Sequence, residues 1–405
     1  MTSTITTSAA DQAADSARAG SELAERVRDL APLLREHAPG TEDTCQPADA
    51  CVAALTDAGL FKMTVAKRFG GNEICVSDQF DAMCEVARHC PSTAWVAAIY
   101  MEAAFLLGLM SDRAQQDVYA DSPNVNVTSV ISPTGSATPT DGGYTVSGRW
   151  AFNSGSIHGD WALLALVVNP GDGDRYPALV LLPYSDLDIA RDWQTSGLRG
   201  TGSNTVSAAD VFVPEHRLML FSDVLQGTSL SEANSGALLW QCHPAAFLFA
   251  GGIAVSVGLA KGAIDEFTTR LPGRGITYTN YSSQLDAPIT HLQFGGAHLR
   301  VEAAEFHGRR AGEIVDSAAR CGTQLSMLDR AQVRGQAGRS VELCTEAVDL
   351  LDAASGASSI MRTVPIQRYG RDMRALYRHA LYYPPTNQEL YGRVLLGLEP
   401  NSHFL

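Results

Sequence analysis

The chain has 405 residues, and its 30 Lys and Arg against 44 Asp and Glu leave a formal net charge of −14 with neutral His. Nucleic acids and anionic membranes are bound through Lys and Arg, so this charge argues against both partners. Hydrophobic residues make up 45% of the chain and charged residues 18%, which supports a sizeable core and excludes global disorder.

Cysteine usage and the apolar segments predict a cytoplasmic protein. The eight cysteines include no C-x-x-C pair and no spacing typical of zinc ligands, so we expect reduced, buried thiols and no metal site. Residues 1–21 lack a basic segment followed by an apolar one, so they are interpreted as a frayed tail and not as a secretory signal. The apolar stretch 245–260 is shorter than a bilayer span and predicts a core helix.

Residues 20–122 are predicted to form an N-terminal helical domain. Apolar residues recur at helical spacing in the segment ELAERVRDLAPLLREHA. A further helix should end near Gly59, and Ser77 is a plausible N-cap for the next one. The segment 91–110 is apolar on nearly all sides and predicts a deeply buried helix.

Residues 123–222 change in character, since β-branched residues and turn signals dominate. A strand over 124–132 should end at Pro133, and the Asp-Gly-Gly sequence at 141–143 predicts a hairpin turn. The Gly- and Asp-rich segment 171–174 separates two apolar strands. About seven short strands are expected, forming a compact β-barrel or sandwich.

Residues 235–400 are predicted to form a C-terminal four-helix bundle. Long apolar periodic segments indicate helices over 245–271, 289–321, 325–355 and 365–381. The predicted fold class is therefore α+β, with helices before and after a β-domain.

None of the common short motifs for dinucleotide binding, nucleotide hydrolysis, serine hydrolysis or zinc proteolysis is present. A first segment of interest passes from an aromatic strand, with Trp150 and Phe152, into Asn153, Ser154 and Gly155. Small residues of this kind allow backbone N–H groups to approach a flat polar ring closely. An ordinary strand and turn is the alternative interpretation.

Two further segments contain candidate residues. Thr201 and Ser203 lie in a Gly-rich stretch between strands, which could cradle a cofactor or form a long turn. His379 follows Arg371 and Asp372 on a predicted helix. A single helical His is more often structural, and the Arg-Asp pair could simply tie helices together.

Together these segments resemble the acyl-CoA dehydrogenase superfamily, and more closely its oxygen-using branch, the two-component (group D) flavin-dependent monooxygenases. The family pattern S-T-A-W-V is matched by residues 92–96, and W-x-F-x-S-G-x-x-x-(A/G)-D-W by residues 150–161. The pattern G-(M/L)-R-G-T-G-S-N with V-F-V-P is matched by residues 197–214, and R-D-x-R-A with a following His by residues 371–379.

The resemblance implies the acyl-CoA dehydrogenase fold, a homotetramer, and a flavin between the β-domain and the bundle. It implies that residues 153–155, together with Thr201 and Ser203, face the flavin ring, with Trp150 beside it. Arg274 and Gly356, in the turn 354–358, are candidates for holding the phosphate end, including from a neighbouring subunit.

The chemistry implied is that of an oxygenase. Acyl-CoA dehydrogenases of this type carry a catalytic Glu at a position that falls near Ala380, where this chain has no carboxylate. The oxygenases have a His on this helix, so His379 is the expected general base. Ser154 is the expected partner of the flavin or of its C4a-hydroperoxide. The expected enzyme hydroxylates a small, natural-product-type molecule with O₂ and with reduced FMN or FAD from a separate NAD(P)H:flavin reductase.

One departure leaves the reaction open. Many relatives have a second His where this chain has Ala103, next to Glu102. Trp95, Glu102 and His158 are therefore assigned to the substrate pocket, with Glu102 as a possible replacement for the missing His. A flavin oxidase or dehydrogenase without oxygen insertion, and a helical scaffold without flavin, are the alternatives.

Overall fold

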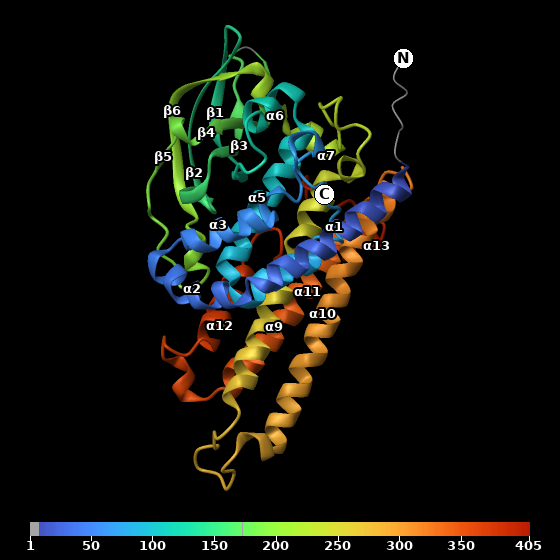
Figure 1. Cartoon of the computed structure of the whole chain (residues 1–405). Coiled ribbons are helices and arrows are strands. Elements are labelled where there is room, and N and C mark those ends of the chain that lie inside the picture. Colours follow the sequence, from blue (N-terminus) through green and yellow to red (C-terminus); the bar gives the residue numbers. More distant parts are fainter. Residues whose placement is uncertain (1–7, 172) are drawn as a thin grey trace.

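The computed structural model describes residues 8–171 and 173–405, and it is a mixed α+β protein with one sheet. The sheet lies at one end of the molecule, and long helices extend away from it (Figure 1). Six α-helices precede the sheet in the described chain: α1 (Ala9–Asp29), α2 (Ala31–Thr44), α3 (Asp49–Ala58), α4 (Phe80–His89), α5 (Pro91–Leu109) and α6 (Asp112–Tyr119).

Two predictions for this region are corrected. The expected tail is helical from Ala9, because the Ser8 side chain accepts a hydrogen bond from the backbone N–H of Asp11 and caps the helix; residues 1–7 lie outside the described chain. Ser77 does not cap α4, which begins later, at Phe80. Its hydroxyl and its backbone N–H both donate to the buried carboxylate of Asp316.

The predicted helix end at Gly59 is confirmed, with a φ of 86° that suits glycine. The predicted buried helix is α5, which is enclosed on almost all sides. Two stretches are long and apolar enough to cross a membrane, namely α5 and Pro244–Arg270, and 94% of the apolar window in each is buried inside the protein. Their apolar surface is therefore already covered by other elements of the chain.

The strands form a single seven-stranded sheet in the order β5-β6-β2-β1-β3-β4-β7. They are β1 (Val127–Thr140), β2 (Gly143–Asn153), β3 (Trp161–Val168), β4 (Tyr176–Pro183), β5 (Asp188–Ile189), β6 (Asn204–Pro214) and β7 (Leu218–Leu220). The predicted hairpin is confirmed, since Thr140 pairs with Gly143. The predicted turn at 171–174 lies between β3 and β4, with Asp172 outside the described residues.

The described strands of the expected compact barrel or sandwich belong to one hydrogen-bonded sheet. The hydrogen-bonded order of the described strands has two ends, and β1 does not stop at Pro133 but continues to Thr140. Its pairing with β3 shifts register between Val130 and Gly135, so the turn-like sequence there forms a bulge that bends the strand. The bent sheet encloses its own apolar cluster, and β4 and β6 approach each other across it.

Seven α-helices follow the sheet in the described chain: α7 (Phe221–Gln226), α8 (Pro244–Gly251), α9 (Ile253–Arg270), α10 (Pro288–Arg320), α11 (Met327–Ala354), α12 (Ile366–Leu376) and α13 (Pro384–Leu395). Helices α9, α10 and α11 pack along one another, and α12 contacts α9 and α11. Their lengths agree with the predicted segments, with two exceptions.

The helix predicted over 245–271 is interrupted at Gly252, because the Tyr382 hydroxyl donates to the carbonyl of Leu248, four residues earlier. A Cβ on Gly252 would lie 2.1 Å from this hydroxyl. The last predicted helix ends at Leu376, so His379 lies in a turn and not on a helix. The turn is closed by hydrogen bonds from the His379 N–H to the Leu376 carbonyl and from the Tyr382 N–H to the His379 carbonyl.

Candidate functional site

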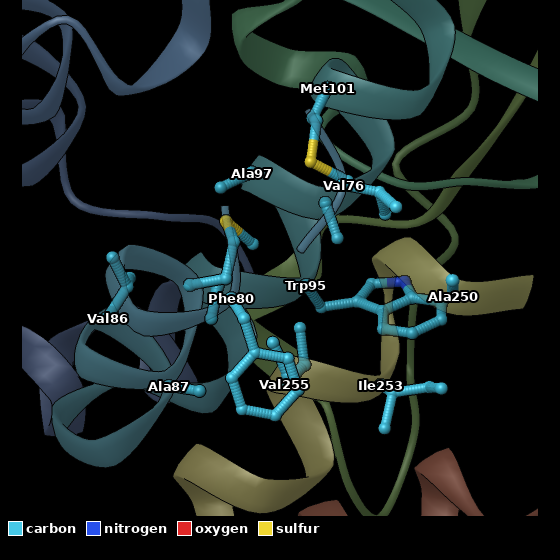
Figure 2. Packing of buried hydrophobic residues seen from close by; sticks show 14 of the residues in the cluster. Val76, Phe80, Val86, Ala87, Trp95, Ala97, Met101, Ala250, Ile253 and Val255 are labelled. Carbon is cyan, nitrogen blue, oxygen red and sulfur yellow. The ribbon is translucent and has the colours of Figure 1, made fainter. Parts of the chain in front are cut away.

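Helix α5 is the element around which the predicted site residues are arranged. It packs against β1 of the sheet, against α8 and α9, and against α12. Figure 2 shows the Trp95 indole pointing from α5 towards Ala250 of α8 and Ile253 of α9. Side chains from the N-terminal helices, the sheet and the C-terminal helices therefore meet along one helix.

A chain of four hydrogen bonds begins at this indole. The Trp95 Nε1–H donates to Ser154 Oγ at 3.1 Å, and Ser154 Oγ lies 2.7 Å from Ser203 Oγ. Ser203 Oγ lies 2.6 Å from Thr201 Oγ1, which donates to the Leu198 carbonyl at 2.8 Å. An indole only donates, a carbonyl only accepts, and each hydroxyl has one proton. The protons must therefore all point from Trp95 towards Leu198, which leaves Ser154 free only as an acceptor.

Glycine at position 155 permits close packing beside this chain of hydrogen bonds. Gly155 has a φ of 76°, and a Cβ on it would lie 2.7 Å from the Tyr100 ring. The Tyr100 hydroxyl donates to the Gly155 carbonyl at 2.7 Å, and the Gly155 N–H donates to the Thr201 carbonyl at 2.8 Å. The two Gly-rich segments singled out in the sequence thus lie side by side, joined by backbone and side-chain hydrogen bonds.

Asn153 provides an unsatisfied amide at the end of β2. Its side chain is fully buried, and its Oδ1 accepts from the Tyr184 hydroxyl at 3.3 Å. Its Nδ2 is enclosed and has no hydrogen-bond partner in the described chain. Since a buried amide donor without an acceptor costs about 1–3 kcal/mol, this group is suited to a carbonyl or ring nitrogen of a ligand.

The Arg-Asp pair holds the loop that precedes β6. The buried Asp372 carboxylate accepts from the Leu198 N–H at 2.6 Å, and Arg371 donates to the Ser196 carbonyl at 2.6 Å. A Cβ on Gly197 would lie 2.1 Å from the Arg371 carbonyl oxygen. Burial raises the pKa of Asp372 to about 6. The pair therefore fixes α12 to the loop that contains Leu198, whose carbonyl accepts the last hydrogen bond of the chain. It does not only connect helices.

His379 contacts Trp95 on the side away from Ser154, where α8, α9 and the turn after α12 lie; this is called the helix side of Trp95, and the side of Ser154 is called its sheet side. The two ring centroids are 4.8 Å apart in an edge-to-face arrangement, and Tyr382 lies 5.6 Å from His379 and 6.1 Å from Trp95. His379 Nδ1 is enclosed and has no hydrogen-bond partner among residues 8–171 and 173–405. Burial lowers the pKa of His379 to about 4, so at neutral pH the ring is uncharged and one nitrogen can accept a proton.

Glu102 lies seven residues after Trp95, on the same face of α5. It is only 6% exposed, and its Oε1 would lie 3.8 Å from a Cβ built on Gly251. No hydrogen bond or ion pair to it is formed within the described chain. Burial raises the pKa of Glu102 to about 8. Its neighbour Ala103, where relatives often have His, is fully buried.

Two predicted residues lie apart from this cluster. Trp150 is fully buried in the apolar core of the sheet, where its Nε1–H donates to the Ala165 carbonyl at 2.6 Å. A register shift between Trp150 and Asn153, with a φ of 63° at Phe152, directs Phe152 to the surface instead. His158 Nε2 pairs with Asp49 on α3 at 2.8 Å, so its contact is with the protein surface.

Arg274 and Gly356 are brought together at the other end of the long helices. The Arg274 guanidinium donates to the Ser355 carbonyl, next to Gly356 with its φ of 65°. Figure 1 shows the segment between α9 and α10, which carries Arg274, at the end of the molecule opposite the sheet. No hydrogen bond in the described chain links this pair directly with Ser154 or His379.

A cavity of about 240 Å³ lies elsewhere, beside the C-terminal end of α10, and none of the predicted site residues lines it. The sequence-based prediction missed three contributors to the site itself, Tyr382, Tyr184 and the Leu198 carbonyl. The two tyrosines carry no motif signal, and a backbone carbonyl has no sequence signal at all. In the described chain no group of three or more His, Cys, Asp and Glu side chains is arranged to hold a metal ion.

Comparison with known proteins gives a consistent result. The family model described as acyl-CoA dehydrogenase, C-terminal domain, matches residues 250–384. The chain is 31% identical to a pigment production hydroxylase of a Rhodococcus species, over 95% of this chain and 98% of that protein. It is 31% identical to HsaA of Rhodococcus jostii, the oxygenase subunit of a flavin-dependent monooxygenase, over 92% and 98% of the two chains.

A third relative is the oxygenase component of an FADH₂-dependent resorcinol hydroxylase from Rhizobium, 30% identical over 94% of this chain and 96% of that one. Among solved structures, XiaF from Streptomyces in complex with FADH₂ and glycerol has a TM-score of 0.90 at 31% identity, covering 96% and 98% of the two chains. The 3-HSA hydroxylase of Rhodococcus has a TM-score of 0.89 at 29% identity, covering 95% and 99%.

Proposed function

Because the chain belongs to the oxygenase components of the two-component flavin-dependent monooxygenases, which have the acyl-CoA dehydrogenase fold, we propose that it hydroxylates a small aromatic substrate bound beside Trp95 and His379. It is an oxidoreductase that uses reduced flavin and O₂, and a separate flavin reductase supplies the reduced flavin. The observation that carries the proposal is that Asn153 and His379 each have an enclosed nitrogen without a hydrogen-bond partner in the described chain. Asn153 is next to Ser154 in the sequence, and the His379 ring contacts Trp95, which donates to Ser154.

The residues present fit a flavin ring. The enclosed Nδ2 of Asn153 offers a donor to a ring carbonyl or nitrogen, and Ser154 offers an acceptor to a ring N–H. Gly155 has no side chain to separate its backbone from a flat ligand, and Thr201 and Ser203 fix the position of Ser154 from behind. These residues are the proposed ring contacts.

The phosphate end of the flavin is assigned to the segment around Gly356. Arg270 and Arg274 both reach this segment, where Arg270 Nη2 lies 3.5 Å from the Ser358 hydroxyl. Neither arginine forms an ion pair with a carboxylate in the described chain, and Arg270 Nη1 is enclosed without a partner. Burial and the nearby Arg270 lower the pKa of Arg274. Two unneutralised guanidiniums beside a Gly turn are suited to a phosphate.

The proposed reaction uses the protein groups for positioning and proton transfer. The chemistry that bound reduced flavin supplies is the activation of O₂, with one oxygen atom inserted into the substrate and the other leaving as water. His379, uncharged at neutral pH, accepts the proton of a substrate hydroxyl through its free Nδ1. Trp95 holds Ser154 in place, and the apolar surroundings on α5 and α8 exclude water from the reacting groups.

A homotetramer is proposed as the assembled form. Exposed apolar residues on and just before α10 recur at intervals of three, four and seven: Leu285, Ile289, Leu292, Leu299 and Phe306. This is the spacing of a helix-packing seam, so a second copy of the chain is the proposed occupant. Such an assembly would bring the Arg274 region of one subunit towards another. The Leu299→Lys variant should lower the mass of the assembly in light scattering, whereas Arg310→Lys on the same helix should not.

The division into a helical domain at 20–122, a β-domain at 123–222 and a helical bundle at 235–400 is part of the same proposal. It is supported by the sheet having its own apolar core and by the packing of α9, α10, α11 and α12 on one another. The cytoplasmic location expected from the sequence also remains a proposal.

Rapid mixing of the protein, loaded with chemically reduced flavin, with oxygenated buffer tests the function. An oxygenase should show a long-lived transient absorbance that differs from both reduced and oxidised flavin. With a substrate, one atom of labelled O₂ should enter the product. Direct return to oxidised flavin together with unlabelled product would favour the oxidase or dehydrogenase instead, and absence of flavin binding would favour the scaffold.

A further inference from the structure

Glu102 is a carboxyl that the protein buries without giving it a partner. It lies on the face of α5 that also carries Trp95, and its Oε1 is next to Gly251, where α8 ends. The neighbouring Gly252 leaves the space that the Tyr382 hydroxyl occupies. The charge of Glu102 acts on Tyr382, whose ring lies 5.6 Å from that of His379, so the carboxyl stands beside this aromatic cluster.

No positive charge compensates this carboxyl. Helix α8 contains no ionisable side chain, and α9 contains none before Lys261, which pairs with Glu305. The turn after α12 contributes the uncharged His379 and Tyr382, whose hydroxyl donates to the Leu248 carbonyl at 2.9 Å.

The neighbouring elements add no cation either. On α5 itself, Tyr100 is directed to Gly155, and from α4 the Cys84 thiol donates to the Ala254 carbonyl. The charge of Glu102, when it is ionised, raises the pKa of Tyr382, because both groups would then be negative. The carboxyl therefore faces apolar, aromatic and uncharged groups only.

Two physical costs then constrain the state of Glu102. An ionised carboxylate here would be a buried, unpaired charge, which costs several kcal/mol, so the acid form persists at neutral pH with a pKa raised to about 8. The acid form has one O–H donor, and a buried donor without an acceptor also costs free energy. Because the protein supplies no acceptor in the described chain, the group is suited to one that arrives with a ligand.

We propose that the Glu102 carboxyl donates a hydrogen bond to a hydroxyl or carbonyl oxygen of the aromatic substrate, and so selects substrates that are uncharged at that position. This rests on the proposed function, since it assigns the substrate to the space beside His379. A substrate carboxylate there would add a second buried charge with no cation nearby, and a substrate ammonium has no lone pair to accept the hydrogen bond of the protonated carboxyl.

The test compares Glu102→Gln, Glu102→Leu and the control Met101→Leu, a neighbouring buried position on α5, each loaded with reduced flavin without oxygen. Resorcinol serves as the uncharged probe and p-hydroxyphenylacetate as the anionic one, with binding measured by calorimetry. The wild type should bind resorcinol more tightly than p-hydroxyphenylacetate, and its affinity should fall as the pH rises through about 8. Glu102→Gln keeps an N–H donor, so it should bind resorcinol like the wild type but without this pH dependence. Glu102→Leu should bind about tenfold more weakly.

Tight binding of resorcinol by Glu102→Leu, a preference for p-hydroxyphenylacetate, or no binding of resorcinol by the wild type would overturn the proposal. A merely structural role for Glu102 would not produce the pH dependence or its loss in the Gln variant. Met101→Leu should keep both the affinity and the pH dependence of the wild type.

Infrared spectroscopy gives a second readout that needs no substrate. At pH 7 the wild type should show the carbonyl band of a protonated carboxyl, which Glu102→Gln lacks and resorcinol shifts. Asp316 and Asp372, with pKa values raised to about 6, are mainly ionised at this pH. Absence of the band would overturn the proposal by itself. Rapid mixing of Glu102→Leu with oxygen separates the two proposals. If the variant shows the same transient absorbance as the wild type while the binding tests fail, the role of Glu102 is refuted and the proposed oxygenase function is not.

Discussion

On the sheet side of Trp95, the hydroxyls of Ser154, Ser203 and Thr201 are each bonded to one another or to the protein backbone. On its helix side, the buried Glu102 and the half-buried His379 have polar atoms without a hydrogen-bond partner in the described chain. The two sides are built from the same helix and differ in whether the protein completes their hydrogen bonds.

The difference separates two tasks. A satisfied network is rigid and holds one geometry, which suits a surface that must position a flat cofactor. Unpartnered buried groups destabilise the free protein and are retained where a ligand satisfies them. We therefore expect the substrate to bind on the helix side, where its polar groups complete these hydrogen bonds.

The largest effect should come from replacing the base on the helix side. His379→Gln removes the free nitrogen that accepts the substrate proton, so product formation should fall by about 10²–10⁴-fold, while the transient flavin absorbance without substrate should form as in the wild type. Turnover is measured with labelled O₂. His298→Gln is a matched control, because His298 on α10 also has an enclosed, partnerless nitrogen in the described chain but packs on Phe294. Full, coupled turnover in His379→Gln would remove the assignment of the base.

The stability of the protein should depend on Glu102 in the opposite direction to most carboxyls. Its pKa is raised from 4.5 to about 8 in the folded protein, so the folded state retains a proton that the unfolded state loses, and stability falls as the pH rises from about 4.5 to 8. Glu102→Gln removes this dependence. In thermal unfolding, the free energy of unfolding of the variant relative to that of the wild type should rise by on the order of a few kcal/mol between pH 5 and pH 9. An equal difference at both pH values would contradict an uncharged Glu102.

Removing one hydroxyl from the hydrogen-bonded sheet side should lower stability by a smaller amount and should change the geometry of the site. Ser203→Ala leaves Ser154 without its acceptor and Thr201 without its donor, so the free energy of unfolding should fall by about 1–3 kcal/mol. Flavin binding should weaken as well. Ser340→Ala is the control, because the buried Ser340 donates to the Ala304 carbonyl, away from the site. Equal loss of flavin affinity in both variants would show that the chain of hydroxyls has no special role.

The smallest effect is expected from replacing Trp95, the first donor in the chain of hydrogen bonds that ends at the Leu198 carbonyl. Trp95→Phe keeps the aromatic contact with His379 but removes the only donor to Ser154 among the described residues, at a cost of about 1 kcal/mol. Ser154 can then reorient, so the lifetime of the flavin transient should shorten in rapid mixing. Trp240→Phe, which loses a comparable bond to the Phe105 carbonyl, should leave that lifetime unchanged.

Much of the layout could be predicted from local sequence. The helix that ends at Gly59, the buried α5, the hairpin at Thr140–Gly143 and the long α10 and α11 follow from period, turn chemistry and apolar content. The four short motifs also identified the family correctly, because each combines residue types that a single ligand and fold require together.

Tertiary contacts decided what local patterns could not. Trp150 and Phe152 are two positions apart on one predicted strand, but the bulge after Trp150 separates them, and no local signal marks it. The break at Gly252 exists because the Tyr382 hydroxyl, 130 positions later, needs that space. His379 lies in a turn because that turn is anchored by Tyr382.

The sequence by itself determined which residues have the chemistry of the site: an indole, three hydroxyls, an amide, an imidazole and a carboxyl. Only the tertiary structure decided which of these are satisfied. The direction of the protons from Trp95 to Leu198 follows from distances across three segments of chain. The isolation of Glu102 follows from what α8, α9 and the turn after α12 do not place near it. Hydrogen bonding and desolvation depend on neighbours in space, which the order of residues along the chain does not specify.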